Sequence, residues 1–140
     1  MRPEKRCGNL GGRGTFAAGR QVEYTYKTTG FVEDVKVLEG ISGKHGLPES
    51  SRTSSAYIKL NKDGSFREMR FYDEHHVLYL EIGYHVEPGL SKNGPVLHYH
   101  IYDERFSKFK DAPFYRSEAR LLTAEMKEHY RKYFKGVPLN

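Results

Sequence analysis

The sequence predicts an α+β fold: an antiparallel four-stranded (or larger) β-meander with a C-terminal helix packed on one face. Three observations predict it. Apolar and polar residues alternate in four segments between residues 56 and 103, which is the period of strands with one buried face. Most connections between these segments are short and contain Gly, Asp or Asn, which favours antiparallel neighbours. Near the C-terminus the apolar spacing changes to three and four, which is typical of an amphipathic helix.

The first third of the chain has a weaker pattern. Residues 1–14 combine arginines with glycines and lack periodicity, so they are predicted to form a flexible basic Gly-rich arm, and residues 15–140 to form one domain. Residues 20–27 alternate as a strand, whereas residues 31–38 fit a strand or a short helix equally well. Residues 40–55 form a long polar loop, which in a compact domain is usually functional or disordered.

The elements that follow are better defined. The predicted strands are residues 56–60, 65–72, 77–84 and 95–103, and the first two are joined by a hairpin turn in which Gly64 permits a positive φ. The final helix is expected to begin at the N-cap Thr123 and to stop before Gly136. Its apolar face consists of Met126, Tyr130, Tyr133 and Phe134.

Composition limits the possible partners and locations. A net charge of +5 with eleven Tyr and eight Phe in 140 residues suits a polyanion, and RNA is the partner we expect. No apolar run approaches the ~20 residues of a membrane span, so no membrane partner is predicted. Cys7 is the only cysteine, which excludes an internal disulfide and a Cys-rich zinc site and favours the cytoplasm. No apolar segment follows the basic start, so no signal peptide is expected.

Strand alternation also predicts a polar face. Leu97, Tyr99 and Ile101 would point to one side of the last strand, and His98, His100 and Tyr102 to the other. Extended across the four strands, the apolar side holds Ile58, Leu60, Met69, Phe71, Leu78, Leu80, Ile82, Leu97, Tyr99 and Ile101. The polar side holds Tyr57, Lys59, Glu68, Arg70, Tyr72, Tyr79, Glu81, His85, His98, His100 and Tyr102.

These side chains suit acid–base chemistry on a phosphodiester without a metal or other cofactor. One of His98 and His100 would take the proton of a ribose 2′-hydroxyl and the other would protonate the leaving oxygen, while Arg70 stabilises the developing charge. Glu68 and Glu81 would orient a histidine. The predicted catalytic residues on the sheet are therefore His98, His100, Arg70 and Tyr72, and the predicted substrate-binding residues are Lys59, Tyr57, Tyr79, Tyr102 and Ser54.

Three other interpretations remain open. The polar face could simply keep an exposed sheet in solution. It could bind a metal, because His98 and His100 at i and i+2, with His85 and Glu81 nearby, would form a His-rich site on a strand. The chain could also be a nucleic-acid-binding phage or accessory protein without catalytic activity.

Several motifs between residues 44 and 103 carry a family resemblance. They are Lys44-His45-Gly46-Leu47-Pro48, a Ser-rich stretch, Asp63-Gly64, Arg70-Phe71-Tyr72-Asp73, Leu80-Glu81-Ile82 and His98-Tyr99-His100-Ile101-Tyr102-Asp103. Together they resemble the nuclease-like domains of phage-encoded proteins and bacterial polymorphic toxins in the barnase–EndoU–colicin E5/D–RelE superfamily. The resemblance implies a toxin-like ribonuclease site on the sheet, delivered as part of a larger chain and paired with an immunity or antitoxin protein. It adds His45 to the catalytic residues.

The predicted geometry can be stated in distances. Arg70 and His98 would be separated by the third strand, hence by two strand spacings or ~10 Å, which leaves room for a phosphate and its sugar. His45 lies in a loop and has to fold back over the sheet to reach them. We therefore expect residues 43–48 to cover the polar face, with His45 directed towards His98 or His100.

Overall fold

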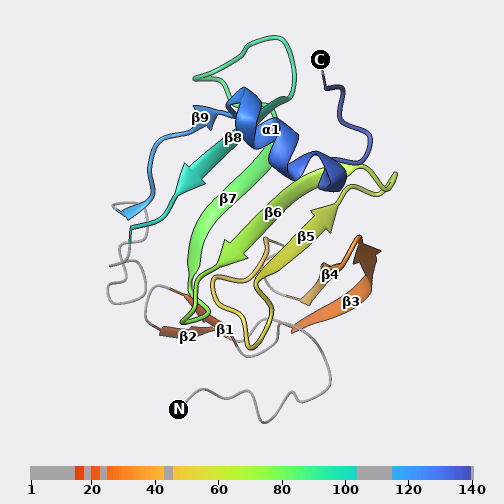
Figure 1. The fold of residues 1–140 in the computed structure, drawn as a ribbon. Coiled ribbons are helices and arrows are strands. Elements are labelled where there is room, and N and C mark those ends of the chain that lie inside the picture. The colour runs from red at the N-terminus through yellow and green to blue at the C-terminus, as the bar shows by residue number, and fades with distance from the viewer. Residues whose placement is uncertain (1–14, 18–19, 23–24, 43–45, 104–114, 140) are drawn as a thin grey trace.

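Over the part of the chain that the structure describes, the architecture is a seven-stranded mixed sheet with one short helix across it (Figure 1). The computed structural model describes residues 15–17, 20–22, 25–42, 46–103 and 115–139, so the predicted arm of residues 1–14 lies outside the described residues. The strand order in the large sheet is β3-β4-β5-β6-β7-β8-β9, and β1 (Thr15–Ala17) and β2 (Arg20–Val22) form a separate pair. The strands of the large sheet are β3 (Thr25–Val32), β4 (Val35–Ser42), β5 (Ala56–Leu60), β6 (Phe66–Tyr72), β7 (Leu78–His85), β8 (Val96–Ile101) and β9 (Arg120–Leu121).

The prediction of a four-stranded antiparallel meander is wrong. Strands β5 to β8 do follow one another in antiparallel order, but β4 and β3 extend the sheet on one side and β9 on the other. Strands β4 and β5 are parallel. Residues 43–55 between them supply the dozen or so residues that a parallel connection requires. Residues 31–38 contain the turn of the β3–β4 hairpin, where Glu33 has a φ of 57°, and not a single strand or helix.

The helix covers one face of the sheet. Helix α1 (Ala124–Tyr130) begins at Thr123, whose hydroxyl oxygen accepts a 3.1 Å hydrogen bond from the Met126 backbone N–H, and it continues into the 3₁₀ turn η4 (Arg131–Tyr133). It crosses strands β6 to β8 (Figure 1). The core beneath it consists of Val32, Val35, Val37, Ala56, Ile58, Phe66, Met69, Leu80, Ile82, Leu97, Leu122, Phe134 and Val137. Among the described residues, no helix has both the length and the apolar character needed to cross a membrane.

The opposite face of the sheet carries a second, Tyr-rich core. It consists of Tyr26, Leu38, Leu47, Tyr57, Tyr72, Leu78 and Tyr102. Much of the predicted polar face is therefore buried, because residues from β3, β4 and the loop before β5 pack on it. Only part of this face can meet a solute.

A β-bulge changes the face assignment of two residues. Phe71 pairs with Leu80 and Tyr72 with Leu78, so Tyr79 is an extra residue in β7. Leu78, expected on the apolar side, consequently joins the Tyr-rich core, and Tyr79, expected on the polar side, lies beside helix-side residues at 42% exposure. Strict alternation along one strand cannot foresee such an insertion.

Candidate functional site

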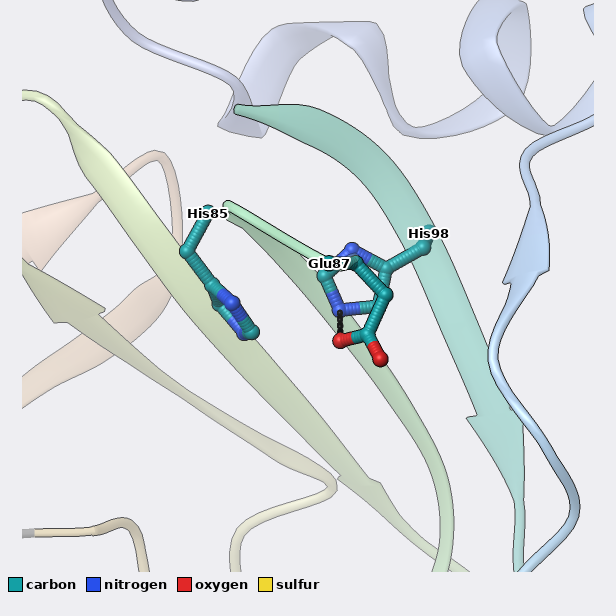
Figure 2. A group of neighbouring side chains, drawn as sticks. All are labelled: His85, Glu87 and His98. Carbon is teal, nitrogen blue, oxygen red and sulfur yellow. Dashed lines mark ion pairs between the residues drawn. The ribbon is translucent and has the colours of Figure 1, made fainter. Parts of the chain in front are cut away.

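A group of histidines lies where β7 ends and β8 begins, on the face opposite α1 (Figure 2). The strand register positions it, because Gly83 is paired with His98, and Glu81 with His100. His85 is two residues after Gly83 and therefore shares its face. Figure 2 shows the side chains of His85, Glu87 and His98 gathered at this end of the strands.

Gly83 leaves the space that the histidine rings occupy. A Cβ atom at residue 83 would come within 3.1 Å of the His85 Nε2 and 3.4 Å of the His98 Cε1. The rings of His85 and His98 meet edge to face, with centroids 4.5 Å apart, and His98 meets His100 in the same way at 5.7 Å. A side chain at residue 83 would therefore push the His85 and His98 rings apart.

Each of the three rings is held through its Nδ1 atom. His98 Nδ1 lies 2.9 Å from the Val96 carbonyl oxygen, and His100 Nδ1 lies 2.9 Å from the Ser117 carbonyl oxygen. His85 Nδ1 lies 3.1 Å from the Val86 carbonyl oxygen. Because a carbonyl oxygen only accepts, Nδ1 carries the proton in each ring, and Nε2 of the neutral imidazole keeps its lone pair for chemistry.

Glu87 is the carboxylate of the group. Its Oε1 lies 3.6 Å from His98 Nε2, and its side chain is 29% exposed whereas that of His98 is 2% exposed. Burial lowers the pKa of His98, and the hydrogen bond to Val96 and the nearby Glu87 only partly oppose this effect. His98 is thus a buried neutral imidazole with one carboxylate beside it, close to the surface.

An ionic network whose side chains are only 13–14% exposed occupies the neighbouring part of the same face. Arg70 Nε lies 3.4 Å from Glu81 Oε2 and 3.6 Å from Glu68 Oε2, and the Tyr102 hydroxyl donates a 3.0 Å hydrogen bond to Glu81 Oε1. Burial raises the pKa of Glu68 despite Arg70. For Glu81 the effect of burial is outweighed by Arg70 and Tyr102, so its pKa lies below the usual range. Arg70 thus lies between two carboxylates whose pKa values shift in opposite directions.

The network also holds the loop that precedes β5. Arg70 Nη1 donates a 2.7 Å hydrogen bond to the Leu47 carbonyl oxygen, and the Tyr72 hydroxyl donates one of 2.6 Å to that of Pro48. The Tyr26 hydroxyl donates a 2.7 Å bond to the Gly46 carbonyl oxygen. Residues 46–48, the described part of the loop expected over this face, do lie on it, and the predicted catalytic His45 lies outside the described residues.

The register separates two residues that were expected to act together. Arg70 pairs with Glu81, which pairs with His100, so Arg70 is level with His100 and not with His98. Glu81, whose carboxylate is bonded to Arg70, is paired with Arg70 on one side and with His100 on the other.

The other predicted residues of this face have structural contacts. Tyr72 and Tyr57 are buried edge to face, with centroids 5.4 Å apart, and Lys59 pairs across the strands with Glu68.

Two predicted substrate-binding residues lie away from the histidines. Ser54 and Tyr79 line a cleft of about 590 Å³ together with Phe71 and Tyr130. Phe71 and Tyr130 belong to the helix side of the sheet. The predicted site is thus divided between the two faces.

Sequence reasoning missed Glu87 and gave His85 a role only in a metal site. The signal was present, because His85 and Glu87 are two residues apart at the end of a strand, as His98 and His100 are on the next strand. Their approach to His98 depends on the β7–β8 register, which the sequence does not specify on its own.

Comparisons with known proteins found no relative of this chain. No family model matches it, and neither a curated protein nor a solved structure matches it significantly.

Proposed function

We propose that the chain is an endoribonuclease that uses His98 and His85 as a general base and a general acid, without a metal. One observation carries the proposal: the two rings are in contact at 4.5 Å, each is fixed through Nδ1, and their Nε2 atoms remain able to exchange protons. The resemblance of the motifs around His98 to nuclease-like toxin domains supports RNA as the substrate. The net charge of +5 favours a polyanion.

The proposed reaction is an internal transesterification. His98 Nε2 takes the proton of the ribose 2′-hydroxyl, and the 2′-oxygen attacks the adjacent phosphorus. The bond from phosphorus to the 5′-oxygen breaks, and a His85 that is protonated on both ring nitrogens gives its Nε2 proton to that oxygen, which leaves a 2′,3′-cyclic phosphate and a 5′-hydroxyl. Glu87, 3.6 Å from His98 Nε2, stabilises the imidazolium that forms. The predicted role of Arg70 in charge stabilisation would require it to leave Glu81 and the Leu47 carbonyl oxygen.

The test is cleavage of single-stranded RNA in excess EDTA, with the product ends identified. We expect 2′,3′-cyclic phosphates, and rates reduced roughly 10²–10⁴-fold in His85→Ala and in His98→Ala. His75→Ala is the matched control, because His75 is an exposed histidine that also lies beside a glutamate, with its Nε2 3.4 Å from Glu74 Oε2. Folding of each variant is checked by its urea unfolding curve.

Two results would contradict the proposal. One is intact RNA at every concentration of a folded protein, and the other is an equal loss of rate in His75→Ala and His85→Ala. RNA retention on filters that weakens with salt, without cleavage, would instead indicate a nucleic-acid-binding protein. If cellular RNA is the target, expression of the active chain arrests growth unless an immunity or antitoxin protein is present, and His98→Ala relieves the arrest.

A further inference from the structure

The group formed by His85, Glu87 and His98 also has the composition of a metal site. One ligand atom from each residue lies within 4.8 Å of those of the other two. In a tetrahedral site with bonds of 2.0–2.2 Å, ligand atoms are about 3.3–3.6 Å apart. The 3.6 Å between His98 Nε2 and Glu87 Oε1 already falls at that spacing. Because all three ligand atoms lie within 4.8 Å of one another, an inward movement of the half-exposed His85 by no more than about 1.5 Å would complete the set.

The orientation of the rings supports the same conclusion. Histidines that bind metals usually donate their second ring N–H to a carbonyl or carboxylate, which fixes the tautomer and turns the other nitrogen to the ion. Both His85 and His98 have this bond, to the Val86 and Val96 carbonyl oxygens. Two imidazoles with one carboxylate favour zinc and related transition metals over magnesium or calcium, which prefer oxygen ligands.

We propose that a zinc-class divalent ion binds through His85 Nε2, His98 Nε2 and the Glu87 carboxylate, with solvent at the fourth position. Three protein ligands with water or substrate at the fourth position are the pattern of catalytic zinc sites, in contrast to closed structural ones. His85 and Glu87 are only half-buried, so the fourth position faces solvent. The binding site itself is independent of the ribonuclease proposal.

A regulatory consequence does rest on the proposed ribonuclease activity. The metal would occupy the lone pairs of both Nε2 atoms that the cleavage reaction uses for proton transfer. Zinc would therefore inhibit RNA cleavage, and EDTA would restore it. The same three residues would pass between a catalytic and a metal-bound state.

Binding is tested by titrating zinc into the chelator-treated protein with calorimetry, and by cobalt(II) absorption, which reports the coordination geometry. We expect one ion per chain and tetrahedral cobalt bands. His85→Ala and Glu87→Gln should each weaken zinc binding at least 10-fold, because even the outer partners of metal ligands are worth 10–100-fold. These two variants are preferred to His98→Ala because their side chains are half-exposed and their removal leaves the core intact. His75→Ala again serves as the control.

The outcomes separate the two proposals. Zinc binding that is absent, or equally weakened by His75→Ala and His85→Ala, overturns the metal site whatever the RNA assay gives. One-to-one binding lost in His85→Ala supports the site even if no RNA is cleaved, in which case the ribonuclease proposal alone fails. Cleavage that continues at full rate with zinc bound overturns the inhibition.

Discussion

Substitution of Gly83 by alanine tests the histidine group without removing any of its members. A Cβ atom at this position would lie 3.1 Å from His85 Nε2, 3.2 Å from His85 Cδ2 and 3.4 Å from His98 Cε1. Gly83 does not have a positive φ, so alanine fits its backbone. The half-exposed His85 ring is the group that can move, because His98 is buried. Gly83→Ala should therefore displace His85 while the sheet is preserved.

The size of the effect follows from the contact distances. Nonbonded carbon atoms prefer about 3.5–4.0 Å, so His85 has to withdraw by roughly half an ångström. Metal-ligand distances tolerate only about 0.2 Å, and we expect zinc affinity to fall roughly 10- to 100-fold, as when an orienting partner is lost. A misplacement of about 1 Å can lower a catalysed rate about 100-fold, so this smaller displacement should lower the cleavage rate roughly 10-fold. Stability should change little, because a Gly→Ala gain of about 0.4–1 kcal/mol opposes the crowding.

Gly30→Ala is the matched control. Gly30 also lies within a strand of the large sheet, and a Cβ atom there would meet nothing within 4 Å. Zinc titration, the RNA cleavage rate and urea unfolding are measured for both variants. Wild-type zinc affinity and wild-type cleavage in a folded Gly83→Ala protein would refute the assignment of His85. Unfolding of Gly83→Ala alone would show that the space beside Gly83 cannot relax through His85.

Three further predictions concern stability. Burial raises the pKa of Glu68, so the stability that its protonated form contributes is present below the unfolded pKa and is lost as pH rises through the folded pKa. In urea unfolding, Glu68→Gln should therefore be at least as stable as the wild type at pH 7. This advantage should shrink towards pH 4. Despite its burial, Glu81 has a lowered pKa because of Arg70, so the stability that its carboxylate contributes is present above the unfolded pKa and is lost as pH falls through the folded pKa. Glu81→Gln should therefore lower the free energy of unfolding by roughly 1.5–3 kcal/mol at pH 7 and by less at pH 4. A loss of stability in both Glu68→Gln and Glu81→Gln at pH 7, or a gain in both, would contradict these opposite roles. Phe134→Ala should lose about 3–5 kcal/mol, because the buried ring packs 4.9 Å from that of Phe66, and a loss below 1 kcal/mol would exclude it from the core.

The local elements could be predicted from the sequence where strong patterns coincide with good turn residues. The strand ranges 56–60 and 65–72 differ from β5 and β6 by at most one residue, and Thr123 caps the helix as expected. The β3–β4 hairpin was not recognised, because its turn contains Glu33 and Asp34 in place of a Gly-containing turn. The parallel β4–β5 pair depends on where a long loop returns the chain, and no local pattern encodes that.

The candidate site was predictable at the level of a sheet face but not at the level of contacts. Alternation correctly placed Arg70, Glu81, His98 and His100 on one face, because side-chain direction is a local property of a strand. Contacts between strands depend on register, and the bulge at Tyr79 changes both register and facing. The burial of Arg70 under residues 46–48 is a tertiary effect of packing from elsewhere in the chain.

The rows of paired residues explain why chemistry is expected at one end of this face. In the row of Arg70, Glu81 and His100, the Arg70 guanidinium is bonded to carboxylates and to the Leu47 carbonyl oxygen. Its hydrogen bonds therefore hold the loop that precedes β5. Removing Arg70 or drawing it away would leave Glu81 without its cation, which limits the use of this row in binding a passing ligand. In the next row Gly83 is paired with His98. Because Gly83 has no side chain, the His85 ring can lie beside His98, and the half-exposed Glu87 approaches from the loop that follows β7. The row of Arg70 therefore fixes the scaffold, and the row of Gly83 and His98 can exchange protons or ligands with solvent through the half-exposed His85 and Glu87.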